Sequence, residues 1–176
     1  MARIIRLSLV VLSGLLCAAS VLEAGFVDVV NKVSVTSYRN YLDNSLYTRT
    51  GDNRGIGGPQ HDPARDNIFN LFSSFGLNVS LDPFDYGGST YHNVVAKKTG
   101  STRPNDIYVI GAHYDSVGNP GADDNASGVA GVLEAARVLA SEPLDATLVF
   151  IAFDREEQGL VGSTAYANAH PTDNIL

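Results

Sequence analysis

Two apolar runs decide the fold of this chain, Asp106-Ile-Tyr-Val-Ile-Gly-Ala-His113 and Ala146-Thr-Leu-Val-Phe-Ile-Ala-Phe-Asp154. Each run is nearly continuous, which is typical of a strand that is buried on both faces of a sheet. Between them, residues 127–139 repeat apolar side chains at the spacing of one helix face. A strand, a helix and a second strand in this order predict two parallel strands in a layered α/β domain.

The flanking sequence extends this alternation in both directions. The further elements that we predict are helices over residues 26–47, 62–76 and 162–168, and strands over 77–84, 90–96 and from 174 onward. We expect Asp62 to cap the helix over 62–76 and Gly76 to end it. Residues 51–59 are rich in glycine and predict a flexible surface loop.

Length and composition exclude several classes of protein. The chain has 176 residues, enough for one domain, and its 19 acidic and 12 basic residues give a net charge of −7. A nucleic-acid-binding surface needs basic side chains to neutralise phosphates, so this charge disfavours that class. The chain has one cysteine, which excludes an internal disulfide framework and an all-cysteine zinc site.

The first 24 residues have the pattern of a signal peptide. Arg3 and Arg6 precede a short apolar core, and small residues follow it, so we expect cleavage after Ala19 or Ala24. Residues 25–60 then form an N-terminal helix and loop segment, and residues 61–176 form the main domain. We expect a secreted or periplasmic protein that is not stably inserted in a membrane once the signal peptide is removed.

Polar residues gather at the ends of the predicted strands, in three clusters. The clusters are Gly111-Ala-His-Tyr-Asp-Ser116, Gly121-Ala-Asp-Asp-Asn-Ala-Ser-Gly128 and Phe153-Asp-Arg-Glu-Glu-Gln-Gly-Leu-Val-Gly-Ser163. In open α/β sheets, ligands bind beyond the carboxyl ends of the strands. The clusters supply one imidazole and several carboxylates, a mixture of nitrogen and oxygen ligands that suits zinc.

The spacing within each cluster indicates specific chemistry. His113 and Asp115 project from one face of an extended chain, so Asp115 can hold the far ring nitrogen of His113. A carboxylate in the Asp123-Asp124 turn can bridge two metal ions, and one of the adjacent Glu156 and Glu157 can bind metal while the other accepts a proton. The other histidines lie in or beside loops, where we expect them to be solvated: His61, His92 and His170.

These three motifs, in this order, resemble those of the co-catalytic zinc exopeptidases, a family that includes secreted bacterial aminopeptidases, plasma glutamate carboxypeptidase-like enzymes and glutaminyl cyclases. The resemblance covers roughly residues 60 to 176. It implies a three-layer α/β/α sandwich around a mixed, largely parallel sheet. Residues 61–176 would then be the N-terminal part of a zinc peptidase domain, incomplete at its C-terminus.

The resemblance also implies a role for each site residue. His113 would bind one zinc ion, Asp124 would bridge two ions, and Glu157 would bind the second. Glu156 would be the general base and acid, and Asp115 would act with it in catalysis by orienting His113. The Asp124–Asn125 peptide bond is expected to be cis. Arg155 stands where a small or apolar residue is expected.

Two further zinc ligands of the family, an aspartate and a histidine, are expected beyond Leu176. Asp173 and His170 lie in the connection before residue 174, where we do not expect them to substitute. We therefore predict that the chain is the N-terminal part of an exported zinc aminopeptidase that acts on peptides with a free N-terminus. The alternatives are a glutaminyl-cyclase-like acyltransferase and a non-catalytic domain that lacks the last ligands. The sequence leaves the oligomeric state open.

Overall fold

A computed structural model of the chain describes residues 25–48 and 53–176. The chain divides into two compact units, Met1–Val33 and Ser34–Leu176. In the first unit, residues 25–30 are helical. The predicted signal peptide, residues 1–24, lies outside the described residues. Among the helices of the described ranges, none combines the length and apolarity needed to cross a bilayer.

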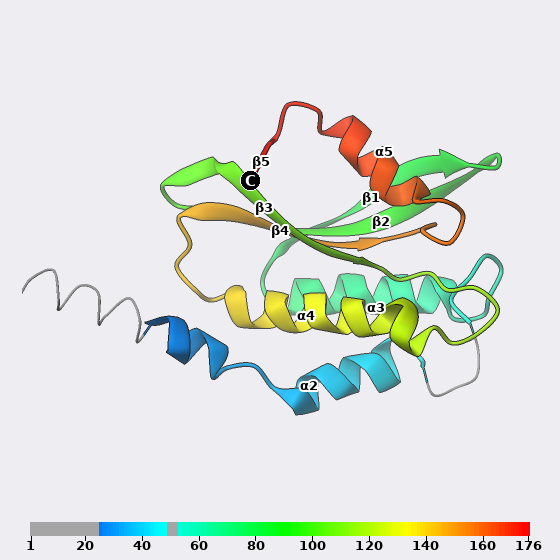
Figure 1. Cartoon of the computed structure of the whole chain (residues 1–176), viewed down its shortest axis with the longest axis horizontal. Helices are drawn as coiled ribbons and strands as arrows, with labels where there is room; N and C mark the ends of the chain where they lie inside the picture. The colour runs from blue at the N-terminus through cyan, green and yellow to red at the C-terminus, as the bar shows by residue number, and fades with distance from the viewer. Residues whose placement is uncertain (1–24, 49–52) are drawn as a thin grey trace, which may run out of the picture. The chain divides into compact units, whose positions relative to one another are not determined.

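The second unit is built on a sheet of five strands in the order β1-β2-β4-β3-β5 (Figure 1). The strands are β1 (Asn78–Tyr86), β2 (Ser89–Lys98), β3 (Arg103–His113), β4 (Ala146–Phe153) and β5 (Asn174–Ile175). Strand β2 pairs antiparallel with β1 and β4, whereas β3 pairs parallel with β4 and β5. Strand β2 therefore runs against the other four, which confirms the mixed, largely parallel sheet.

Helices cover both faces of this sheet (Figure 1). On one face lie α2 (Val35–Asn40), α3 (His61–Ser74) and α4 (Ser127–Leu139), and on the other lies α5 (Val161–Ala169) beside β1 and β2. The three-layer sandwich is thus confirmed. The predicted helix over 26–47 is interrupted, because Ser34 starts α2 anew by accepting a hydrogen bond from the Ser37 amide at 3.2 Å.

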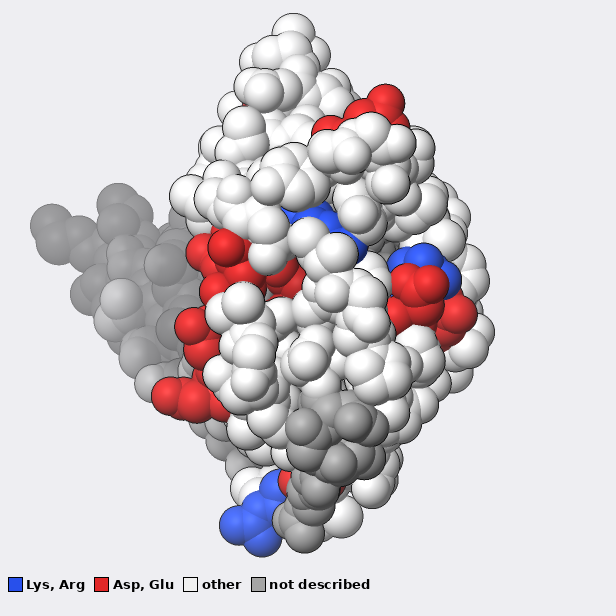
Figure 2. Space-filling model, turned by 90° about the vertical axis from the view of Figure 1, so that its right-hand side faces the viewer, with Lys and Arg blue, Asp and Glu red and all other residues white. Residues whose placement is uncertain are grey.

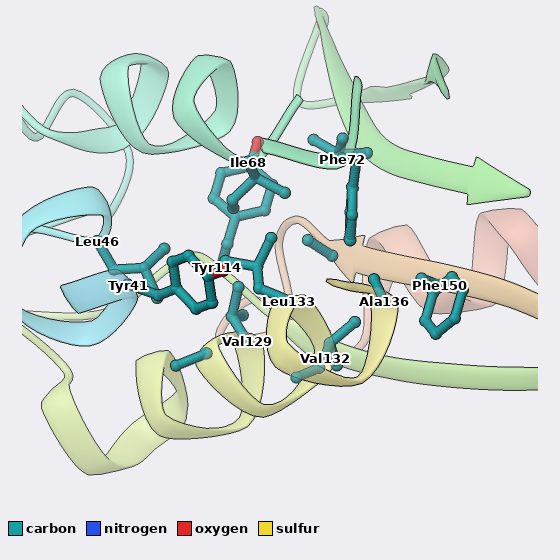
Figure 3. Close-up of a cluster of buried hydrophobic side chains, with 14 of the residues drawn as sticks. Tyr41, Leu46, Ile68, Phe72, Tyr114, Val129, Val132, Leu133, Ala136 and Phe150 are labelled. Atoms are coloured by element: carbon teal, nitrogen blue, oxygen red, sulfur yellow. The ribbon is translucent and has the colours of Figure 1, made fainter. Parts of the chain in front are cut away.

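The main core lies between the sheet and the α3–α4 layer. Figure 3 shows side chains of α3 and α4, among them Phe72 and Leu133, in one buried cluster with Phe150 of β4. All three are fully buried. The prediction of two-face burial holds for β4. It is wrong for β3, because Tyr108 in the middle of that strand is 42% exposed.

Helix α3 begins one residue before the predicted cap. Gln60 is the N-cap and makes no side-chain capping bond, whereas Asp62 lies in the first turn. The prediction that Asp62 caps the helix is therefore wrong. Asp62 instead accepts from His61, with 2.9 Å between Oδ1 and Nδ1. Gly76 follows the end of the helix with φ +81°, a left-handed conformation that glycine adopts without steric cost, as expected.

Candidate metal centre and catalytic site

The parallel pairing of β3 and β4 brings two of the predicted clusters to one edge of the sheet. His113, the last residue of β3, stands opposite Phe153, the last residue of β4. The turn that carries Asp124 leads into α4, so its start lies at the same edge. The right-hand side of Figure 1, where these strands end, faces the viewer in Figure 2, and Asp and Glu side chains gather there.

His113 is the centre of this cluster and is 7% exposed. Its Nδ1 lies 3.3 Å from Oδ1 of Asp115, and its Nε2 lies 2.9 Å from Oδ1 of Asp124 and 3.6 Å from Oε2 of Glu156. Burial lowers the pKa of His113, but the hydrogen bond and charge of Asp115, with Glu156 and Asp124, outweigh it and raise the pKa to about 9.

Asp115 is fully buried and joins two of the clusters. Besides facing His113, its carboxylate accepts hydrogen bonds from the main-chain amides of Glu156 at 3.2 Å and Glu157 at 3.3 Å. Sequence spacing indicated the contact with His113 but gave no signal for these two amides, because they are 41 and 42 residues away. One carboxylate therefore fixes both the imidazole and the start of the Glu156-Glu157 turn.

The turn that carries Asp124 is compact and strongly bent. Its Asp124–Asn125 peptide bond is cis, in agreement with the expectation from the resemblance. Gly121 begins the turn with φ +54°, and the amide of Ala126 donates to the Gly121 oxygen at 3.1 Å. The Asp124 side chain is 78% exposed, so its second carboxylate oxygen is open to a ligand.

Glu156 and Glu157 follow β4 on the other side of His113. The Glu156 side chain is about one-third exposed, at 34%, and Glu157 is half-buried. Burial raises the pKa of Glu157, and the negative charge of Asp124 raises it further, although His113 opposes this. Of the two carboxylates, Glu156 lies near the His113 ring at 3.6 Å.

The donor set fits zinc in chemistry and partly in arrangement. Two ligand atoms on a tetrahedral zinc ion stand about 3.3 Å apart, close to the 2.9 Å between His113 and Asp124. Across residues 25–48 and 53–176, however, no three His, Cys, Asp or Glu side chains are already arranged as a metal-binding group. Of the predicted ligands, His113 and Asp124 are in contact, while Glu157 acts on them through its charge.

Two buried residues beside the site were expected to be solvated. Arg54 lies in the stretch predicted as a flexible surface loop, yet it is fully buried against the loop that follows β3. His61 is 7% exposed, and its Nε2 lies 2.9 Å from Oδ1 of Asp154, next to the Glu156-Glu157 turn. Both predictions are wrong because the burial comes from contacts with residues distant in sequence.

Arg155 is accommodated away from solvent. It is 1% exposed, and its guanidinium carbon lies 3.7 Å from the centre of the Tyr91 ring. Its main chain has φ +59°, a conformation that turns the chain sharply between β4 and Glu156. A large cation is therefore compatible with this position, because the aromatic ring offers it a favourable face.

Comparison with known proteins finds similarity to peptidases. The family model of Peptidase family M28 matches residues 93–176. Aminopeptidase YwaD of Bacillus subtilis is 46% identical over 85 residues, which cover 47% of this chain and 19% of that protein. A probable zinc metalloprotease of Pyricularia oryzae is 34% identical over 153 residues, which cover 74% of this chain and 30% of that protein.

Solved structures show the same fold at lower identity. LapB from Legionella pneumophila has a TM-score of 0.70 at 23% identity, over 84% of this chain and 42% of that one. A glutaminyl cyclase of Bacteroides thetaiotaomicron has a TM-score of 0.65 at 20% identity, over 81% and 59%. The chain matches between 18% and 37% of the length of its curated relatives.

Proposed function

Because residues 93–176 belong to peptidase family M28, we propose that this chain carries the site of a zinc-dependent exopeptidase, an aminopeptidase that hydrolyses N-terminal residues from peptides. The names of two relatives, an aminopeptidase and a probable zinc metalloprotease, support a peptide hydrolase that uses zinc. The acidic side chains at the site edge and the net charge of −7 suit a substrate with a free amino group.

One observation carries this proposal. The carboxylate of Asp115 contacts His113 and accepts hydrogen bonds from the amides of Glu156 and Glu157. It therefore holds an imidazole that can bind a metal ion close to a carboxylate that can accept a proton. The result is 3.6 Å between the His113 ring and the Glu156 carboxylate. Side chains placed this closely by buried hydrogen bonds are characteristic of a preorganised hydrolytic site.

The metal would be held by His113, Asp124 and Glu157, with Asp124 bridging two ions. When bound, zinc supplies a Lewis acid that polarises the peptide carbonyl and lowers the pKa of water. Asp115 would keep the His113 ring in one orientation, with Nε2 facing the Asp124 carboxylate beside which the metal would bind.

Glu156 would carry the proton. It accepts a proton from the attacking water and passes that proton to the leaving amine when the peptide bond breaks. Its partly exposed carboxylate can reach both partners, whereas the main chain of this residue is fixed by Asp115. Asp115 itself is too deeply buried to exchange protons with substrate, so we assign it the task of orientation.

Replacing the proton carrier tests this function. Glu156→Gln should lower release of N-terminal residues from a peptide by about 10²–10⁴-fold, because the amide cannot accept the proton. Zinc content should stay at the level of the unchanged chain. Released residues are measured by mass spectrometry with zinc added, and Glu142→Gln, beyond the far end of α4, is the control.

Other outcomes of this experiment would contradict the proposal. Full turnover by Glu156→Gln would exclude this residue as the base. Loss of ammonia from peptides that begin with glutamine, without cleavage, would favour a glutaminyl-cyclase-like reaction. Zinc binding too weak to measure, with no turnover, would favour a non-catalytic domain.

We also propose that the protein is exported. The basic and apolar pattern of residues 1–24 supports a signal peptide, with residues 25–60 as a helix and loop segment before the peptidase part. N-terminal sequencing of the protein from an expressing cell should find a mature end at residue 20 or 25. An intact residue 1 on the recovered protein would contradict this.

A further inference from the structure

Arg54 is a buried arginine that makes its hydrogen bonds to main-chain carbonyls. Its Nε donates to the oxygen of Tyr114 at 2.7 Å and its Nη2 donates to the oxygen of Gly121 at 3.0 Å. Its Nη1 donates to the oxygens of Leu46, at 3.1 Å, and Pro120. A single guanidinium therefore links three separate segments of the chain.

The bond to Gly121 reaches the turn that carries Asp124. The oxygen of Gly121 also accepts from the amide of Ala126, so it is held from both sides. A Cβ atom at Gly121 would collide with the main-chain oxygen of Asp124 and stand 3.1 Å from Nη2 of Arg54. The guanidinium thus packs directly against the first residue of this turn.

Arg54 also contacts the residues on both sides of Asp115. Its side chain binds the oxygen of Tyr114, and its main-chain amide donates to Oγ of Ser116 at 2.9 Å. Ser116 in turn donates to the oxygen of Asn119 at 3.0 Å, which closes the loop between Asp115 and Gly121. Both predicted site residues that lie between β3 and α4 are therefore anchored through one arginine.

We propose that Arg54 is a positioning residue that fixes Asp115 and the 121–126 turn relative to each other. Lysine would not serve, because its ammonium cannot present the planar fork of donors that reaches Tyr114 and Gly121 together. The expected effect of Arg54 on zinc affinity rests on the proposed function, whereas its expected effect on the order of the loop does not.

The charge of Arg54 supports this placement. Burial lowers its pKa to about 10, while the negative charge of Asp115 opposes that shift. The guanidinium is therefore still protonated at neutral pH.

The test combines amide hydrogen exchange with zinc affinity. In Arg54→Met, exchange at the Ala126 and Glu157 amides should become about two- to tenfold faster, as expected for the loss of buried hydrogen bonds. Zinc should bind about 10–100-fold more weakly in competition with a chromogenic chelator. Arg103→Met, which removes an exposed arginine paired with Asp106 at the opposite end of β3, should change neither quantity.

A second variant covers the case in which Arg54→Met does not fold. Arg54→Lys keeps the charge but loses the fork, and it should show the same faster exchange and weaker zinc binding. Unchanged exchange at both amides in a folded Arg54 variant would overturn the proposal. A third outcome is that neither the unchanged chain nor the Arg54 variants bind zinc, while amide exchange is still faster in the variants. This outcome would support the positioning role and contradict the proposed zinc function.

Discussion

Asp123 and Asp124 are neighbours with the same side chain, yet their surroundings differ. Oδ1 of Asp124 lies 2.9 Å from Nε2 of His113, whereas the main-chain oxygen of Asp123 accepts a hydrogen bond from Oγ of Ser127 at 2.7 Å. The difference supports our proposal that Asp124 bridges zinc and that Asp123 shapes the turn. It also provides a matched pair of substitutions.

Asp124→Asn should lower zinc affinity by more than about 100-fold, because a direct ligand contributes at least as much as its supporting partners do. Asp123→Asn should bind zinc as the unchanged chain does. A chelator competition assay at neutral pH measures both. Equal losses of zinc affinity in the two variants would show that zinc binding depends on the total charge of the turn and not on the position of Asp124.

Some site residues could be predicted from the sequence and others could not. His113, Asp115, Asp124 and Glu156 were expected together because they follow elements whose ends meet at one edge of the sheet. Arg54 gave no comparable signal, because a charged residue among glycines is typical of a solvated loop. Its burial depends on Tyr114 and Gly121, which are 60 and 67 residues away along the chain.

At the scale of elements, the first residue of α3 is joined to the end of β4. His61 lies 2.9 Å from both Asp154, which is fully buried, and Asp62. Burial lowers the pKa of His61, but the two aspartates outweigh it, so that the pKa lies above its ordinary value of 6.5. The His61 imidazole thus links a helix on one face of the sheet to the turn that holds Glu156.

This link predicts a pH dependence of stability. A pKa that is higher in the folded chain than in the unfolded chain gives stability that is fully present below about pH 6.5. That stability is lost as the pH rises through the folded pKa. His61→Gln should cost about 1.5–3 kcal/mol at low pH, which is the range for hydrogen bonds to charged groups, and should cost less at high pH.

Urea unfolding of the metal-free chain at several pH values measures this effect. His92→Gln is the control, because it alters a histidine of β2 outside the His61–Asp154 contact. A loss of stability in His61→Gln that does not change with pH would mean that the imidazole acts through packing alone.

The elements themselves were largely predictable. The apolar runs of β3 and β4 and the stripe of α4 specified a parallel strand–helix–strand unit, because strong periodicity over many residues leaves few alternatives. The helix over 26–47 was predicted less well. Its apolar residues repeat weakly, and the capping bond of Ser34, which starts α2, outweighs that pattern.

At the scale of the whole molecule, the comparisons confirm the family resemblance that the three motifs indicated. The match to Peptidase family M28 covers residues 93–176, which contain all three motifs. The fold likeness to LapB extends over 84% of the chain, and therefore includes elements before residue 93. Arg54 belongs to that preceding part, so the matched region by itself does not contain every contact that supports the site.

The hydrogen bonds from Glu156 and Glu157 to Asp115 have a consequence for the order of folding. They close a loop of 41 residues, and closing such a loop costs conformational entropy that local contacts must first offset. Helix α4 and strand β4 lie within this loop and strand β3 directly precedes it, so the packing of these three elements has to precede the approach of the two glutamates. Zinc uptake during refolding would therefore report a late event, after the central unit of the sheet has formed.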